Sequence, residues 1–221
     1  MKKLALLFCA FAAAALAPLA PAAALDPAKD KAVKAVDALI AKAKVDKAQP
    51  NWRSALSKPE AVAFDPARKY FARMATNRGT MRIQLYPDLA PLHVTNFLYL
   101  VRLGFHDGLK FHRVIPGFMA QGGCPRGNGT GDAGYEFAAE ISPKVKHDKA
   151  GVLSTANRGP GTDSSQFFLT FGPAPWLDGG YTIFGQVTEG LETLQGLEAV
   201  GSASGRTKDL VKVEKVTIEV E

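Results

Sequence analysis

Cysteine is nearly absent from this chain of 221 residues, which has only Cys9 and Cys124. So few thiols exclude a fold held together by a framework of disulfides. Histidine is also scarce, and none of the four histidines stands at a metal-ligand spacing from Cys, Asp or Glu; they are His93, His106, His112 and His147. No metal site is therefore predicted.

Neither sign of charge dominates the sequence. Lys and Arg number 27 against 21 Asp and Glu, a formal net charge of +6, and the basic residues are scattered. A nucleic-acid-binding protein would gather them on one face together with aromatic residues. We therefore expect a solvated surface of mixed charge and no nucleic-acid partner. The length predicts one domain with extensions.

Residues 1–24 have the three parts of a signal peptide. A positive "MKK" precedes the apolar run "LALLFCAFAAAALA", and "PLAPAAA" supplies small residues for cleavage. An uncleaved membrane anchor is the alternative, because residues 4–25 carry no charge. We predict cleavage, since alanine dominates the run and two prolines interrupt it. Cleavage would leave Cys124 as the only thiol, either buried and inert or reactive.

Residues 25–66 are predicted to form a helical extension and a connector. Ala and Lys favour a helix over 26–48, with Asp26 as N-cap and Pro27 at the first helical position. Val33, Val36 and Ile40 form a narrow apolar stripe that could dock on the main domain or on a partner, or stay largely solvated.

Residues 67–221 have the pattern of a mainly β domain. "NRG" between "YFARMAT" and "TMRIQLY" predicts a hairpin, and six further short runs are typical of strands. Helices are predicted from Pro91 to Gly104 and over "GLETLQGLEAV". In the last strand the apolar alternation slips between Val213 and Val216, which indicates a bulge. Without regular βαβ alternation, these elements predict an antiparallel barrel or sandwich capped by two helices.

Familiar cofactor and nucleophile motifs do not explain the chain. "GTGDAG" at 129–134 matches a dinucleotide fingerprint, but no strand leads into it and no convincing helix follows. "GSASG" at 201–205 has Ala203 where a nucleophile elbow needs serine. We predict no cofactor.

The stretch "FHRVIPGFMAQGG" (111–123) places a permanent charge in an apolar run. Alternation predicts that Phe111, Arg113 and Ile115 share one strand face, and the Pro-Gly turn would bring Met119 and Gln121 beside Arg113. An apolar bowl with one cation and one amide suits a mainly apolar ligand with a carbonyl to polarise. An ordinary core strand whose arginine reaches solvent also explains the stretch alone.

Three segments in order resemble the signatures of the cyclophilin family of peptidyl-prolyl cis-trans isomerases. They are "FHRVIPGFMAQGG", "GVLSTANRGPGTDSSQFFLT" and "WLDGGYTIFGQV", and the resemblance runs from about residue 69 to residue 221. It implies an eight-stranded antiparallel β-barrel capped by two α-helices, which agrees with the independent strand and helix pattern.

The resemblance also implies roles for individual residues. Arg113, Phe118 and Gln121 would be catalytic, with Arg113 donating a hydrogen bond to the prolyl nitrogen. The other expected substrate-binding residues are His112, Met119, Ala156, Asn157, Gln166, Phe168, Trp176, Leu177 and Tyr181. Trp176 stands where the family contacts cyclosporin, so cyclosporin-type inhibitors are expected partners. Cys124, Thr155 and Tyr181 replace the family's frequent Asp, Met and His, so the resemblance implies the catalysis but not the family's fine substrate preference.

We therefore predict a peptidyl-prolyl cis-trans isomerase that assists the folding of exported proteins, a monomer with proline-containing polypeptides as substrates. A proline-peptide binding or chaperone module with incidental catalysis is the alternative, and a structural part of an envelope assembly through residues 26–65 is a third. The leader predicts export, with only transient membrane contact. The destination would be the periplasm of a Gram-negative source and otherwise the medium.

Overall fold

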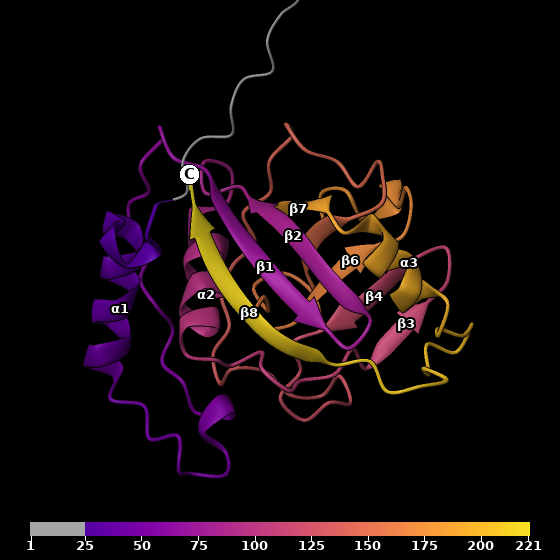
Figure 1. Ribbon diagram of the computed structural model, residues 1–221, viewed down its shortest axis with the longest axis horizontal. Coiled ribbons are helices and arrows are strands. Elements are labelled where there is room, and N and C mark those ends of the chain that lie inside the picture. The colour runs from indigo at the N-terminus through magenta and orange to yellow at the C-terminus, as the bar shows by residue number, and fades with distance from the viewer. Residues whose placement is uncertain (1–24) are drawn as a thin grey trace, which may run out of the picture.

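The computed structural model describes residues 25–221, so the predicted signal peptide, 1–24, lies outside the described residues. Eight antiparallel strands form one curved sheet in the order β3-β4-β6-β5-β7-β2-β1-β8 (Figure 1). Their bounds are β1 Tyr70–Thr76, β2 Gly79–Leu85, β3 Arg113–Ile115, β4 Met119–Gly122, β5 Val152–Thr155, β6 Phe167–Thr170, β7 Ile183–Glu189 and β8 Val213–Val220. The mainly β, antiparallel fold class predicted from the sequence is confirmed.

Hydrogen bonds bring the two ends of this sheet together. The segment before β3 pairs with the segment before β8 through the bridge Lys110–Lys212. The backbone N–H of Phe111 donates to the carbonyl of Val211 over 2.9 Å, and that of Val213 donates to Leu109 over 2.8 Å. The sheet therefore curves round on itself as a barrel rather than stacking as a sandwich.

Helices cover the openings of the barrel. The helix α2 spans Pro91–Arg102 and α3 spans Leu191–Glu198, and Figure 1 shows them on opposite sides. Both predicted helices are confirmed. Residues 25–221 also contain three short 3-10 turns, η1 Pro27–Lys29, η2 Trp52–Ser54 and η3 Pro175–Leu177.

Two local predictions about strand geometry are confirmed. Strands β1 and β2 form the predicted hairpin, in which Gly79 has φ of +127°, a conformation that L side chains rarely adopt. In the pairing of β1 with β8, Ala75 faces Lys215 while Thr76 faces Val213. Glu214 is thus the extra residue of the predicted bulge.

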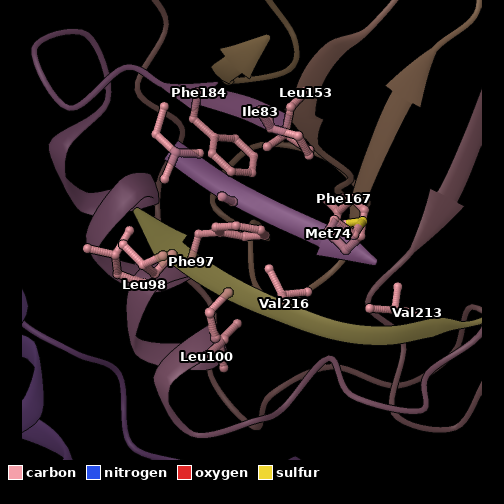
Figure 2. Packing of buried hydrophobic residues seen from close by; sticks show 14 of the residues in the cluster. Met74, Ile83, Phe97, Leu98, Leu100, Leu153, Phe167, Phe184, Val213 and Val216 are labelled. Carbon is pink, nitrogen blue, oxygen red and sulfur yellow. The ribbon is translucent and has the colours of Figure 1, made fainter. Parts of the chain in front are cut away.

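The barrel interior is a continuous apolar core. Figure 2 shows Phe97 of α2 packed among Ile83, Phe184 and Val216 from the strands. A smaller apolar cluster lies apart from this core and consists of Met119, Phe168, Ala174 and Leu177. Burial of apolar area supplies most of the folding free energy. Three members of the separate cluster, Met119, Phe168 and Leu177, line a surface pocket.

The N-terminal helix α1 is shorter than predicted and packs on the main domain. It spans Lys31–Ala43 and is capped by Asp30, whose carboxylate accepts the N–H groups of Ala32 (2.9 Å) and Val33 (3.1 Å). The predicted cap, Asp26, instead caps the turn η1, because a break at Asp30 separates that turn from the helix.

The apolar stripe of α1 docks on α2. Val33 and Val36 are fully buried in the same core as the barrel, and Asp37 accepts two hydrogen bonds from Arg102, each of 2.7 Å. Figure 1 shows α1 beside α2. The stripe is therefore not a free surface for a partner, which removes the feature behind an envelope-assembly role. The boundary between residues 66 and 67 stays a prediction.

Candidate active site

The hairpin of β3 and β4 carries the central side chains of the candidate site. Its register pairs Arg113 with Gln121 and Ile115 with Met119, which confirms the expected juxtaposition. The turn between the strands uses Gly117 at φ +72°. Side chains of paired residues share a face of the sheet, so Arg113 and Gln121 emerge together.

One detail of this hairpin differs from the sequence prediction. Phe111 does not share a face with Arg113, since β3 begins only at Arg113 and Phe111 is buried in the barrel core together with Val114. The cause is the hydrogen bond from Phe111 to Val211, which ties the preceding segment to the start of β8. The chain therefore changes direction between Phe111 and Arg113.

The structure gathers nine of the twelve predicted site residues around one pocket of about 100 Å³. They are Arg113, Phe118, Met119, Gln121, Ala156, Asn157, Phe168, Leu177 and Tyr181. The apolar floor comes from the separate cluster, in which Met119, Phe168 and Leu177 are buried. Phe118 is half-buried at one side. The pocket suits a compact apolar group such as a pyrrolidine ring.

A buried histidine supports the floor of this pocket from behind. The ring of His147 stacks on Phe168 with centroids 5.9 Å apart. Its Nδ1 lies 2.9 Å from the carboxylate of Asp178 and its Nε2 lies 3.1 Å from the Ser154 hydroxyl. Burial lowers the pKa of His147 below its ordinary value, although Asp178 opposes the shift. Both ring nitrogens are thus occupied, which fixes the plane on which Phe168 rests.

A chain of amides orients the guanidinium of Arg113. Its Nη1 donates to Oε1 of Gln121 over 3.4 Å, and Nε2 of Gln121 donates to Oε1 of Gln166 over 2.9 Å. Gln166 in turn donates to the backbone carbonyls of Gly129 (2.9 Å) and Gly131 (2.8 Å). Because these carbonyls only accept, every amide in the chain has one defined orientation.

The remaining predicted residues lie around the pocket rather than in it. Gln166 is buried behind Gln121. Trp176 is 68 % exposed, and its ring centroid lies 5.8 Å from that of Phe118. His112 lines a neighbouring hollow beside Arg113. Burial, followed by the charges of Lys110 and Arg113, lowers the pKa of His112 to about 4, so its ring is neutral at neutral pH.

Asn157 lines both the pocket and an adjoining groove, which Gln121 and Gln166 also line. Its Nδ2 donates to the carbonyl of Gly180 over 3.0 Å, while its Oδ1 accepts the N–H of Gly159 over 3.2 Å. The first bond joins the segment after β5 to the loop before Tyr181, and the second closes a turn within that segment. The groove wall is thereby fixed before any ligand binds.

Sequence reasoning missed a buried ion-pair network beneath the groove. The ring of His93 lies between two carboxylates, with Nδ1 2.6 Å from Glu140 and Nε2 2.8 Å from Asp163. Burial alone would lower the pKa of His93, but the hydrogen bonds to Asp163 and Glu140 raise it above its ordinary value. The network ties α2 to the segment that leads into Gln166. No local motif signals it, because its members are 47 and 70 residues apart.

Cys124 is a buried thiol that helps to close the loop after β4. Its Sγ accepts the N–H groups of Gly129 and Gly131, each over 3.3 Å. Burial alone would raise the pKa of the thiol, but the backbone donors of Gly131, Asn128 and Gly129 lower it below its ordinary value. The side chain is fully buried, so it is not presented to a substrate.

The arrangement suits noncovalent chemistry on a bound ligand. The pocket offers a guanidinium, two amides and an apolar floor, and its lining contains no serine, cysteine, histidine or carboxylate. Across residues 25–221, no group of three His, Cys, Asp or Glu side chains is placed to hold a metal ion. No helix in that part of the chain is long and apolar enough to cross a bilayer.

Comparisons with known proteins agree with this geometry. Residues 71–218 match the family model for "Cyclophilin type peptidyl-prolyl cis-trans isomerase/CLD". The chain is 46% identical to peptidyl-prolyl cis-trans isomerase-like 1 of Gibberella zeae over 66% of this chain and 92% of the relative. It is 42% identical to peptidyl-prolyl cis-trans isomerase cypE of Dictyostelium discoideum over 65% of this chain and 94% of that protein.

A solved structure shows the same fold. The crystal structure of a cyclophilin type peptidyl-prolyl cis-trans isomerase from Cryptosporidium parvum superposes with a TM-score of 0.66 at 37% identity, covering 68% of this chain and 97% of that one. Sequence, fold and the pocket beside Arg113 thus lead to one conclusion. This chain belongs to the cyclophilin-type peptidyl-prolyl cis-trans isomerases.

Proposed function

We propose that the chain accelerates X–Pro rotation in exported polypeptides, with Arg113 as the residue that stabilises the twisted amide. One observation carries this assignment. The guanidinium of Arg113 stands at the edge of an apolar pocket, held by a chain of amides, and no carboxylate among residues 25–221 pairs with it. Its remaining donors are free to meet a ligand.

The chemistry requires no bond to break. Rotation about an X–Pro bond has a barrier of roughly 18–20 kcal/mol because the planar amide is stabilised by resonance. Cis and trans differ by only about 0.5–1 kcal/mol. When the amide twists, its nitrogen becomes pyramidal and can accept a hydrogen bond. A guanidinium that donates to this nitrogen stabilises the twisted state more than either planar state, which is differential transition-state binding.

Each neighbour has a part in this mechanism. Phe118, Met119, Phe168 and Leu177 would hold the proline ring and exclude water, which strengthens the hydrogen bond from Arg113. Gln121 would hold the guanidinium and bond a substrate carbonyl, while Asn157 would hold the substrate backbone. A related Cryptosporidium parvum enzyme, 37% identical, was crystallised in the presence of the dipeptide Ala-Pro, which supports a proline-containing ligand for this pocket.

The test is an isomerisation assay on an X–Pro peptide with the wild type, Arg113→Ala and Arg113→Lys. We expect kcat/KM to fall on the order of a hundredfold or more for Arg113→Ala, because one preorganised donor commonly contributes that much. Arg113→Lys keeps the charge but loses the planar fork, so it should recover only part of the rate. Equal rates in correctly folded wild type and Arg113→Ala would refute the mechanism.

Export is supported by the leader pattern of residues 1–24. The full chain, produced in a Gram-negative cell, should be recovered from the periplasm with its new N-terminus close to residue 25. Protein in the cytosol that still begins at Met1 would contradict this part of the proposal without touching the isomerase assignment.

A further inference from the structure

A second hollow adjoins the pocket on the other side of Arg113, and its charged side chains have one sign. It has a volume of about 410 Å³ and shares Arg113 and Gln121 with the proline pocket. Lys110, Arg113 and Arg206 line it together with neutral residues, and no Asp or Glu does. All three cationic side chains belong to exposed residues.

Most of the other arginines in the described residues already have polar partners. Six of the ten form ion pairs with carboxylates, namely Arg68, Arg73, Arg78, Arg82, Arg102 and Arg158. Arg53 gives its donors to the carbonyls of Phe105 and Asp107. The three others are Arg113, Arg126 and Arg206. Two of these three, Arg113 and Arg206, line this hollow, whereas Arg73 and Arg82 on β1 and β2 have carboxylates beside them.

The loop 201–206 is built to hold Arg206 beside Arg113. Gly205 has φ +80°, and a Cβ at this position would lie 2.7 Å from Cγ of Arg113. The carbonyl of Gly205 accepts the N–H of Val114 over 2.9 Å, which fixes the loop to β3. The Ser202 hydroxyl donates to the carbonyl of Arg206 over 2.6 Å. Only glycine allows this close approach, so the loop backbone rests on the stem of Arg113.

The loop after β4 packs against Lys110, one of the three cationic residues that line the hollow. A Cβ at Gly127 would lie 2.7 Å from Cε of Lys110, and one at Gly131 would lie 2.8 Å from Cγ of Arg126. The side chains of Lys110 and Arg126 thus pack along the loop 126–131. With no carboxylate in the lining, the hollow has a positive potential that an anionic group of a ligand would lower.

We propose that this hollow binds an acidic side chain of the client polypeptide, close in sequence to the isomerised proline, with Arg206 as the specificity-determining residue. The inference rests on the proposed function, because it concerns the chain that occupies the pocket at Arg113. The hollow would recognise an anionic side chain, either the carboxylate of Asp or Glu or a phosphorylated residue. Lysine at the same position would be repelled.

The effect is moderate and depends on salt. The cations are exposed, so each attraction is screened by water and each pair contributes about 1 kcal/mol or less, a factor of about five in affinity. The Debye screening length decreases as the ionic strength rises, from about 10 Å at 0.1 M to about 3 Å at 1 M. A preference for acidic clients should therefore be clear at low salt and nearly vanish at high salt.

The experiment compares peptides that are identical except for Glu, Gln, Lys or phosphoserine at one position, scanned over the residues on both sides of the proline. At about 20 mM salt we expect kcat/KM for the Glu peptide to exceed that for the Lys peptide about fivefold at one or more positions, with phosphoserine higher still. The ratio should approach one at about 0.5 M salt.

Two variants separate local recognition from net charge. Arg206→Glu should abolish or invert the Glu-to-Lys ratio. Lys34→Glu makes the same charge change on the exposed face of α1 and should leave the ratio intact. A preference for phosphoserine without one for Glu would assign the anion to phosphorylated clients.

An active enzyme with equal rates for Glu and Lys peptides at every position would overturn the inference, as would an undiminished ratio in Arg206→Glu. Both outcomes leave the proposed function standing. No catalysis of any peptide, neutral ones included, would instead refute the proposed function itself.

Discussion

Two arginines, Arg82 and Arg113, differ most clearly in how many carboxylate partners they have, and we expect the first to serve stability and the second activity. The guanidinium of Arg82 lies 3.6 Å from the ring centroid of Phe71 and contacts three carboxylates, those of Glu219 (2.8 Å), Glu221 (2.6 Å) and Glu189 (3.3 Å). Within residues 25–221, the guanidinium of Arg113 has a single side-chain hydrogen bond, to an amide oxygen at 3.4 Å.

The difference lies in which donors remain free. Arg82 donates hydrogen bonds to residues of β7 and β8 and to the end of the chain, so it links neighbouring parts of the sheet. Arg113 keeps most of its donors free at the edge of a pocket, and a neutral amide holds it without cancelling its charge. A side chain that must bind a transient species needs this unsatisfied state, which costs little here because Arg113 is exposed to water.

Giving Arg113 a carboxylate partner should make it resemble Arg82, and of the changes considered in this comparison it should have the largest effect. Gln121→Glu would place a negative charge where the amide oxygen now lies, and it would lose the donor to Gln166. We expect kcat/KM to fall about tenfold to a hundredfold, since the guanidinium would turn to its new partner. The isomerisation assay measures this fall.

The control is Gln195→Glu, which makes the same charge change on an exposed position of α3 and should leave the rate unchanged. A full rate in Gln121→Glu would show that a neutral neighbour of Arg113 is not required.

A polar side chain without partners costs much more free energy when it is buried than when it is exposed like Arg113. His106 is such a buried side chain. It is fully buried among Phe97, Phe105 and Phe167, and neither ring nitrogen has a hydrogen-bond partner within residues 25–221. Burial lowers its pKa to about 3, from an ordinary value of 6.5. Between these values the unfolded chain binds a proton that the folded chain does not.

The stability that depends on neutral His106 is therefore complete above about pH 6.5 and is lost as the pH falls, by up to about 1.4 kcal/mol per pH unit. The His106→Phe variant has no titrating group at this position. The difference in free energy of unfolding, wild type minus variant, should therefore fall by about 2 kcal/mol from pH 7 to pH 5. Urea unfolding at both pH values measures this. A difference that does not change with pH would show that His106 is not buried and neutral.

Replacing Arg82, the arginine with three carboxylate partners, should have the smallest of these effects, and the effect should be on stability alone. Arg82→Ala should lower the free energy of unfolding by about 1–2 kcal/mol, because its side chain is only 14% exposed and it leaves several carboxylates together. Arg73→Ala, whose side chain is 49% exposed, should cost less than about 1 kcal/mol. Isomerase activity should be unchanged in both; a loss of activity in Arg82→Ala would contradict the separation of roles.

The sequence predicted those parts of the site that depend on near neighbours. The turn at Pro116 and Gly117 follows from residues adjacent in the chain, and it determines that Arg113 and Gln121 face each other across two strands. The order of three family-like segments predicted the fold class and most of the pocket lining. The prediction that Phe111 shares a strand face with Arg113 was wrong, because a hydrogen bond from Phe111 to the distant Val211 overrides simple alternation.

Patterns along the chain therefore determined the strands, the helices, the hairpin turn and the bulge, and they identified Arg113 as the proposed catalytic side chain. Only the tertiary structure decided which charges have partners. The amide chain from Arg113 to Gly131, the histidine between Glu140 and Asp163, and Arg206 beside Arg113 all join residues that are remote in sequence. Propensity and periodicity act over a few residues, whereas these contacts depend on how the barrel closes and where each loop rests.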